Sequence, residues 1–223
     1  MAGPELAGGQ GIMDTLSWLA DKYHLDFNQS SPIEIPNVGR MTLAEWFGEL
    51  KFKEVAEIGV EQGKFSEILC KANPNGKLFC VDAWETYSGY RDYLNRDFIV
   101  DCYKIARQRL RGFHVQFCKG FSMDMVKQFK DESLDAVYID ANHEYKWVVE
   151  DITEWSKKVR KGGIISGHDY YRSAVVRSRC EVIAALNFYV KEHNIQPWFI
   201  LGTKAKNPGE IRDTSRSWMW IKT

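Results

Sequence analysis

The stretch that decides the fold is Val55-Ala-Glu-Ile-Gly-Val-Glu-Gln-Gly63, which is followed by Lys77-Leu-Phe-Cys-Val-Asp82. Each contains a short apolar run typical of a buried strand; the first leads through a glycine turn to a helix start, and the second ends on an acid. A strand, a tight turn and a helix form the first half of a βαβ unit, and an acid at the tip of the next strand is where a ribose is held. The two segments therefore predict a site for an adenosyl cofactor.

The charge of the turn distinguishes it from a dinucleotide-binding loop. Where a GxGxxG loop has its middle glycine, this chain has Glu61, and Glu57 stands four residues earlier. Two carboxylates would repel a diphosphate. S-adenosylmethionine has no phosphate but carries a sulfonium, an ammonium, a carboxylate and a ribose, so the acidic turn favours it over NAD.

Length and composition fit one domain. The chain has 223 residues, 44% hydrophobic and 13% aromatic, which suffices for an α/β domain with a sizeable core. Thirty basic and thirty acidic residues cancel, so no global field favours nucleic acid or an anionic membrane. We expect residues 1–12, rich in Gly and Ala, to be a tag remnant or a disordered arm. Residues 13–223 are expected to form the domain, with a helical cap over 13–52 and a Rossmann-like core over 53–223.

The cysteines and the apolar runs indicate a cytoplasmic protein. The five cysteines are odd in number and widely spaced, which is typical of reduced core thiols, and no Cys/His cluster suggests zinc. The longest apolar runs are far short of the roughly 20 residues of a membrane span, and the start lacks a signal-peptide pattern. We therefore expect neither a membrane nor a nucleic-acid partner, while homo-oligomerisation stays open.

Strand and helix patterns alternate along most of the chain. Strands are expected at 55–59, 77–81, 114–118, 134–139 and 163–166. Helices are expected at 65–72, 90–110, 123–129 and 145–159, after one that begins at Met13 and one that Thr42 caps together with Glu45. Such βα repeats predict a doubly wound parallel sheet. A long helix at 175–193 is then followed by two apolar segments, 197–202 and 217–222, which predict a hairpin with one antiparallel strand.

Four features together resemble class I S-adenosylmethionine-dependent methyltransferases: the Glu57–Gly63 turn, Asp82, YIDANHEYKWVVEDITEW at 138–155 and GGIISGHDYY at 162–171. The likeness is greatest to the small family of macrolide-sugar O-methyltransferases and cephalosporin-hydroxylase-like proteins, and it covers roughly residues 55–169. The linked D-x-x-H-x-Y…D…W…G-G…H-D pattern is more specific than the turn. The resemblance implies a mostly parallel, seven-stranded Rossmann-like sheet of order 3-2-1-4-5-7-6.

The resemblance also implies which residues bind the cofactor. They are Glu57, Gly59 and Gly63 in the turn, Asp82 for the ribose hydroxyls, Ser122 and Met123 beside the adenine, and Asp140. A carboxylate at a strand end suits paired hydroxyls. The alternative is that Glu57 and Asp82 are ordinary strand-end acids and Met123 is a core residue.

Asp140 and Asp169 close two strands that are neighbours in the predicted sheet. Because neighbouring strands lie about 4.8 Å apart, the two carboxylates can converge on one hard cation. In the resembled sugar methyltransferases, acids at these positions hold a divalent metal, and the third ligand is an acid where this chain has His168. An imidazole suits manganese, iron or zinc better than magnesium. We therefore keep Mg²⁺ or Mn²⁺ as a possible cofactor, beside the alternatives that Asp140 holds the cofactor's amine and that Asp169 caps a loop.

His143 lies three residues after Asp140, and in the resembled enzymes the histidine at this position is the base. An imidazole takes a proton from a hydroxyl at neutral pH, most easily if a metal has acidified that hydroxyl. The alternative is a surface or helix-capping histidine. Asp151 and Trp155 follow at helical spacing, and we interpret Trp155 as core and Asp151 mainly as structural.

The sequence therefore predicts methyl transfer from S-adenosylmethionine to a hydroxyl of a small polar acceptor, a sugar or glycoside, with His143, Asp140 and Asp169 as catalytic residues. Aromatics after the second strand (Trp84, Tyr87, Tyr90, Tyr93) and after Asp169 (Tyr170, Tyr171), with arginines nearby, would suit a sugar ring. Buried rings on an ordinary helix are the competing interpretation. A non-catalytic or hydroxylase-like protein with the same cofactor fold is the alternative function.

Overall fold

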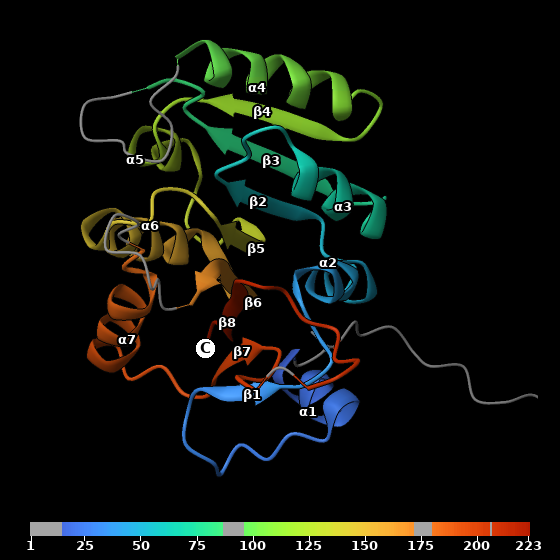
Figure 1. The fold of residues 1–223 in the computed structure, drawn as a ribbon, viewed down its shortest axis with the longest axis vertical. Helices are drawn as coiled ribbons and strands as arrows, with labels where there is room; N and C mark the ends of the chain where they lie inside the picture. Colours follow the sequence, from blue (N-terminus) through green and yellow to red (C-terminus); the bar gives the residue numbers. More distant parts are fainter. Residues whose placement is uncertain (1–14, 87–95, 172–179, 206) are drawn as a thin grey trace, which may run out of the picture.

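The computed structural model describes residues 15–86, 96–171, 180–205 and 207–223. The segment 1–12, which the sequence suggested to be a tag remnant or a disordered arm, lies outside the described residues. Within them the chain forms one sheet with helices on both faces (Figure 1). No helix in these ranges has the length and apolar character needed to cross a bilayer.

The sheet has eight strands in the order β1-β7-β8-β6-β5-β2-β3-β4. They are β1 (Ile33–Ile35), β2 (Glu54–Ile58), β3 (Lys77–Asp82), β4 (Val115–Lys119), β5 (Leu134–Ile139), β6 (Val159–Tyr170), β7 (Trp198–Leu201) and β8 (Arg216–Ile221). Only β8 runs antiparallel to its neighbours, β6 and β7. The predicted seven-strand order and its antiparallel strand near the edge are confirmed.

The eighth strand, β1, was not predicted. It pairs parallel with β7 and lies within residues 13–52, where we expected a helical cap. Ile33 and Ile35 are buried while Glu34 between them faces outward, so the alternation of a strand is present. At three residues, that signal was too short to recognise beside the prolines.

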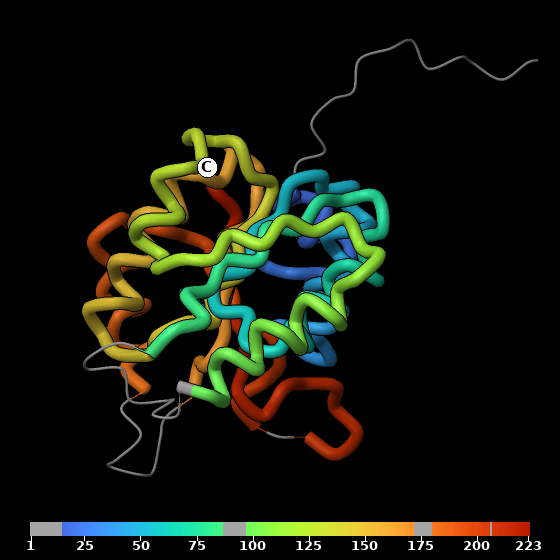
Figure 2. The backbone as a smooth tube through the Cα atoms, turned by 90° about the horizontal axis from the view of Figure 1, so that it is seen from above, coloured from blue at the N-terminus to red at the C-terminus, as the bar shows by residue number. Residues whose placement is uncertain are grey.

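The helices form two layers, which Figure 2 shows from above. One layer contains α1 (Thr15–Tyr23), α2 (Arg40–Glu49), α3 (Lys64–Ala72) and α4 (Arg96–Arg109); the other contains α5 (Ser122–Met125), the short 3₁₀ helix Val126–Gln128, α6 (Tyr145–Lys158) and α7 (Val182–Glu192). α4 and α7 correspond to the later parts of the helices predicted at 90–110 and 175–193. The earlier parts of both predictions include residues outside the described ranges.

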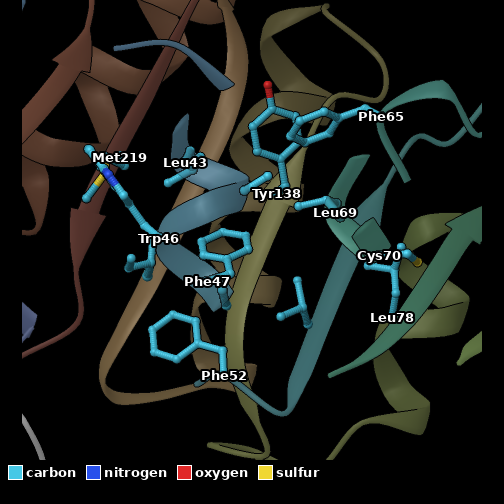
Figure 3. Packing of buried hydrophobic residues seen from close by; sticks show 14 of the residues in the cluster. Leu43, Trp46, Phe47, Phe52, Phe65, Leu69, Cys70, Leu78, Tyr138 and Met219 are labelled. Atoms are coloured by element: carbon cyan, nitrogen blue, oxygen red, sulfur yellow. The ribbon is translucent and has the colours of Figure 1, made fainter. Parts of the chain in front are cut away.

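Alternating strand residues fill a hydrophobic core on each face of the sheet. In β5, Ala136 and Tyr138 pack into the core under α2 and α3, whereas Val137 and Ile139 pack into the core under α6 and α7. Figure 3 shows the first core, where the rings of Tyr138 and Phe65 have centroids 4.5 Å apart. On the last strand Trp218 and Trp220 are buried in the second core, as predicted.

The start of α2 corrects a prediction. We expected Thr42 to cap this helix with Glu45, but α2 begins at Arg40 and its N-cap is Gly39, which has no side chain. A carboxylate from the loop before β8 does the capping instead, because Asp213 Oδ2 accepts the Arg40 N–H at 2.7 Å. Thr42 makes only a long contact, 3.5 Å from its Oγ1 to Gly39 N. The cap comes from a residue 173 positions away, which local sequence patterns do not reveal.

One carboxyl group, Glu57 in β2, is buried beneath the sheet edge at 2% exposure. Among the described residues, the Ser66 hydroxyl in α3 donates a hydrogen bond to it. Burial raises the pKa of Glu57 to about 8, and the nearby Asp140 and Asp82 add to that rise. The carboxyl is therefore largely protonated at neutral pH in this structure.

We expect Asp213→Ala to destabilise the protein by about 1 kcal/mol, because the α2 amide then loses its capping acceptor. Thr42→Ala is the matched control and should cost clearly less. Urea unfolding of both variants measures the difference. A larger loss of stability for Thr42→Ala would show instead that Thr42 caps the helix, as the sequence predicted.

Glu57 generates a second prediction, on pH. Because its pKa is higher in the folded than in the unfolded chain, the folded state retains the proton and its stability falls as pH rises from about 4.5 to about 8. Glu57→Gln mimics the protonated acid, so its stability relative to the wild type should increase over this range, by at most about 1.4 kcal/mol per pH unit. Urea midpoints between pH 5 and 8.5 test this, and parallel pH profiles for the two proteins would contradict it.

Candidate active site

A cavity of about 650 Å³ opens at the carboxyl ends of the parallel strands, which is where ligands bind in open α/β sheets. All the residues predicted to bind the cofactor except Gly63 line it: Glu57, Gly59, Asp82, Ser122, Met123 and Asp140. The cavity lies over the ends of β2, β3 and β5 and the starts of α3, α5 and α6. The sequence-predicted residues are thus brought to one place.

The two glycines of the turn are required for different reasons. Gly59 has φ +89°, and a Cβ there would lie 2.0 Å from the Asp140 carbonyl oxygen, so only glycine lets β2 and β5 end side by side. Gly63 has φ +72°, stands at the N-cap of α3 and packs against α4. It shapes the helix start from behind the cavity wall.

Asp82 holds the turn in place through its carboxylate. Oδ2 accepts the backbone N–H groups of Val60 and Glu61, both at 2.9 Å, and Oδ1 accepts that of Trp84 at 2.7 Å. Burial raises the pKa of Asp82 above its ordinary value, although the three amides work against the rise. Each carboxylate oxygen has two lone pairs, so Oδ1, which accepts one amide, retains one acceptor position.

Trp84 holds the turn in position, a role that the sequence did not reveal. It is buried, its Nε1 donates to the Glu61 carbonyl at 2.8 Å, and its ring packs 4.8 Å from that of Tyr103. Trp84 and Glu61 both have left-handed backbones, with φ of 41° and 50°. Such conformations cost energy outside glycine, so the hydrogen bonds to Asp82 and between these two residues keep a strained turn closed.

A hydrogen-bond chain links Ser122 to α6. The Ser122 hydroxyl donates to Asp151 Oδ1 and accepts the Trp155 Nε1–H at 2.8 Å. Burial raises the pKa of Asp151 to about 7, and its bond to Ser122 opposes the rise. Trp155 is core, as predicted, and Asp151 fixes Ser122 while also lining the cavity. Met123 lines the cavity and also packs against the second core.

A bulge in β6 brings His168 and Asp169 to the same side. Between Gly167 and Tyr170 the pairing with β8 shifts register, and Asp169 has φ 60°. Consecutive residues of a regular strand point to opposite faces, whereas a bulge re-aims one of them. Here His168 Nδ1 lies 3.4 Å from Asp169 Oδ1, which a flat strand would not allow. The sequence carries no recognisable signal for this bulge.

His143, Asp140 and Asp169 meet at this bulge. His143 Nε2 lies 2.8 Å from Asp169 Oδ2 and 3.7 Å from Asp140 Oδ1. One ligand atom from each of the three lies within 4.8 Å of the others, a spacing that suits a metal ion. His168, the predicted third ligand, is not in this group, although its Nδ1 lies 3.7 Å from Asp140 Oδ2. The four predicted residues lie together, and the compact group of three contains His143 in place of His168.

The electrostatics of the cluster favour ionised Asp169. Burial alone would raise its pKa, but the contacts with His143 and His168 hold it well below its usual range. Burial correspondingly lowers the pKa of His168, and Asp169 and Asp140 outweigh that and raise it overall. The Nε2 of His168 is buried and makes no hydrogen bond to a described residue, so only Nδ1 faces the acids. Imidazole and carboxylate thus stabilise each other's charged forms.

The predicted aromatic surface for a sugar is only partly described. Tyr87, Tyr90 and Tyr93 lie outside the described residues. Trp84 is buried behind the turn and Tyr170 packs against Trp198, with ring centroids 6.1 Å apart. Tyr170 therefore packs as a structural ring, whereas Trp84 also lines the cavity.

Comparison with solved structures identifies this fold. The O-methyltransferase TomG from Streptomyces achromogenes in complex with SAM is 16% identical, with a TM-score of 0.55 over 98% of this chain and 92% of that one. The O-methyltransferase from Bacillus cereus in complex with SAH is 17% identical, with a TM-score of 0.53 over 97% and 93%. Cofactor-bound Rv0187 from MTB is 17% identical, with a TM-score of 0.56 over 97% and 92%. At these identities the likeness concerns the fold.

Sequence comparisons address the family. A search of curated proteins found no match. A family model described as a methyltransferase domain matches residues 56–170, just over half of the chain. The matched region runs from β2 to the bulge of β6 and thus contains the turn, the cavity floor and the cluster around His143. The chain belongs to this methyltransferase-domain family.

Proposed function

We propose that the protein transfers a methyl group from S-adenosylmethionine to a hydroxyl of a small polar acceptor, a sugar or glycoside, with His143 as the general base. The observation that supports this most is the contact between His143 and Asp169 at the mouth of a cavity built on the glycine turn. The fold is shared with O-methyltransferases whose structures contain SAM or SAH.

The cavity fits the proposed cofactor. Its volume lies in the range of about 300–1,000 Å³ that is usual for small-ligand sites. The remaining acceptor position on Asp82 Oδ1 suits one ribose hydroxyl, and Ser122 stands on the β4 side where the base would lie. The acids around the turn suit the cationic end of the ligand, whereas a diphosphate would meet repulsion. When bound, S-adenosylmethionine supplies an already activated methyl group.

Because the methyl group is activated, the protein must position the acceptor and remove one proton. His143 is half-buried, with 29% of its side chain exposed, and the neighbouring Asp169 stabilises the imidazolium that proton transfer would produce. The strained backbone of Asp169 fixes this carboxylate against the ring. A polar acceptor such as a sugar suits a site with several carboxylates and histidines.

The compact cluster also supports a second candidate, in which a divalent cation binds Asp140, His143 and Asp169. Two carboxylate oxygens and one imidazole nitrogen fit Mn²⁺, and Mg²⁺ less well. Such an ion would acidify the acceptor hydroxyl. One nitrogen atom cannot bind a metal and accept a proton simultaneously, so the two hypotheses assign different parts to His143.

We expect His143→Ala to lower methyl transfer by about 10²- to 10⁴-fold without weakening cofactor binding, because it removes the base but leaves the turn intact. Formation of S-adenosylhomocysteine with a panel of sugars and glycosides measures transfer, and calorimetry measures binding. The control is His193→Ala, which removes an exposed histidine directly after α7. Full activity of His143→Ala would remove His143 from the mechanism.

Removal of metal ions by a chelator helps to distinguish the two roles proposed for His143, general base and metal ligand. If His143 is a base that works without a metal, activity persists after dialysis against EDTA, and Asp169→Asn lowers the rate because the imidazolium loses its partner. Asparagine tolerates the left-handed backbone at this position, so the fold is retained. Loss of activity in EDTA and its recovery with Mn²⁺ would instead show that a metal is required, and weaker Mn²⁺ binding by His143→Ala would then make His143 a metal ligand.

A further inference from the structure

Arg40, at the start of α2, brings a guanidinium group to the cavity wall. Its Nη1 lies 4.0 Å from Asp140 Oδ2 and its Nε lies 3.9 Å from Asp213 Oδ1. Both distances exceed that of a hydrogen bond, and the guanidinium makes none with the residues that the structure describes. Since a guanidinium has five N–H donors, this group can still bind a ligand in the cavity.

The surrounding contacts hold the side chain in one place. Asp213 binds the Arg40 backbone N–H, and the guanidinium carbon lies 5.3 Å from the centre of the Phe65 ring. Stacking on an aromatic face is a preferred arrangement for arginine and leaves the edge of the group available for a planar anion. The site is therefore arranged before a ligand arrives.

The order of strands indicates which part of the cofactor would meet Arg40. In the order β5-β2-β3-β4, Asp82 ends β3 and Ser122 follows β4, so the ribose and the base would lie on that side. Arg40 lies beside Asp140, which follows β5 on the opposite side. The amino-acid part extends from the ribose away from the base, and thus toward Arg40.

Charge balance supports the same assignment. Among the described cavity-lining residues, the carboxylic acids are Glu57, Glu61, Asp82, Glu85, Asp140 and Asp151, and the permanent cations are Arg40 and Lys64. The ammonium and the sulfonium of the cofactor have many acidic neighbours, whereas its carboxylate needs one of the two cations. Lys64 is exposed, and Arg40 is half-buried against Phe65.

The position of Arg40 also disfavours a purely structural purpose. A cation in the first turn of a helix is opposed by the helix dipole, which prefers an anion there. Asp213 compensates for this at the backbone and at Nε. A ligand carboxylate would complete the compensation and bind in the bidentate geometry that arginine offers.

We infer that Arg40 binds the carboxylate of the methionine part of S-adenosylmethionine. This inference rests on the proposed function, because it assigns one residue to one group of the proposed cofactor. It makes Arg40 a binding residue, and it leaves proton transfer to His143.

Calorimetric titration with two ligands tests the inference. S-adenosylhomocysteine carries the carboxylate, and its decarboxylated analogue S-adenosyl-3-thiopropylamine lacks it. Arg40→Gln should weaken binding of the first by about 10- to 100-fold, the loss expected for a hydrogen-bonded ion pair, and leave binding of the second unchanged. The control is Arg107→Gln, because Arg107 also packs on an aromatic ring, Tyr103, but does not line the cavity. Its affinities should equal those of the wild type.

Four outcomes would overturn the inference. Unchanged binding of S-adenosylhomocysteine to Arg40→Gln would show that the carboxylate lies elsewhere; if the KM for a carboxylate-bearing acceptor then rose, the anion would belong to the acceptor. An equal loss for both ligands would mean that Arg40 only shapes the cavity. Failure of the wild type to bind either ligand would end this inference together with the proposed function, whereas binding without selectivity for the carboxylate would end this inference alone.

Discussion

The carboxylate of Asp82 is the interaction on which the site depends. It ends β3 and accepts backbone amides from Val60 and Glu61 after β2, so it joins two strands and the turn that leads into α3. Trp84 completes this connection, because its backbone N–H donates to the other carboxylate oxygen and its Nε1 donates to the Glu61 carbonyl. Without this anchor, the left-handed residues of the turn would relax, and the cavity floor would lose its shape.

Parallel strands concentrate acids at one edge, and four features reduce the repulsion between them. Glu57 is protonated beneath the turn, with its pKa raised to about 8. Asp82 has its charge compensated by backbone amides, and Asp169 is stabilised by two histidines. Arg40 adds a cation close to Asp140. The edge thus combines carboxylates of different protonation states, which is the condition for binding a cationic ligand and moving a proton in the same place.

The sequence was sufficient where the signal is local. Apolar runs, the glycines at 59 and 63 and strand-end acids predicted the strands and the position of the cofactor turn, because each depends on neighbours within a few residues. The strand order was predicted from the family resemblance. The capping of α2 by Asp213 and the short β1 strand depend on distant partners and were missed.

Within the site, sequence reasoning gathered Asp140, His143, His168 and Asp169 but not their arrangement. The bulge of β6 brings Asp169 beside both histidines, and no residue pattern in the sequence predicts the bulge. Arg40 could have been noticed as a cation at a predicted helix start, where the dipole disfavours it. To recognise this, one must know that α2 begins at Arg40, two residues before the predicted cap Thr42.

The most direct measurement is a calorimetric titration of the wild-type protein with S-adenosylhomocysteine and, separately, with NADH. Both ligands contain an adenosine, so the comparison isolates the effect of the acidic turn on a diphosphate. The account predicts micromolar binding of S-adenosylhomocysteine and no measurable binding of NADH. Binding of NADH with no binding of S-adenosylhomocysteine would contradict the assignment of the cavity and, with it, the proposed reaction.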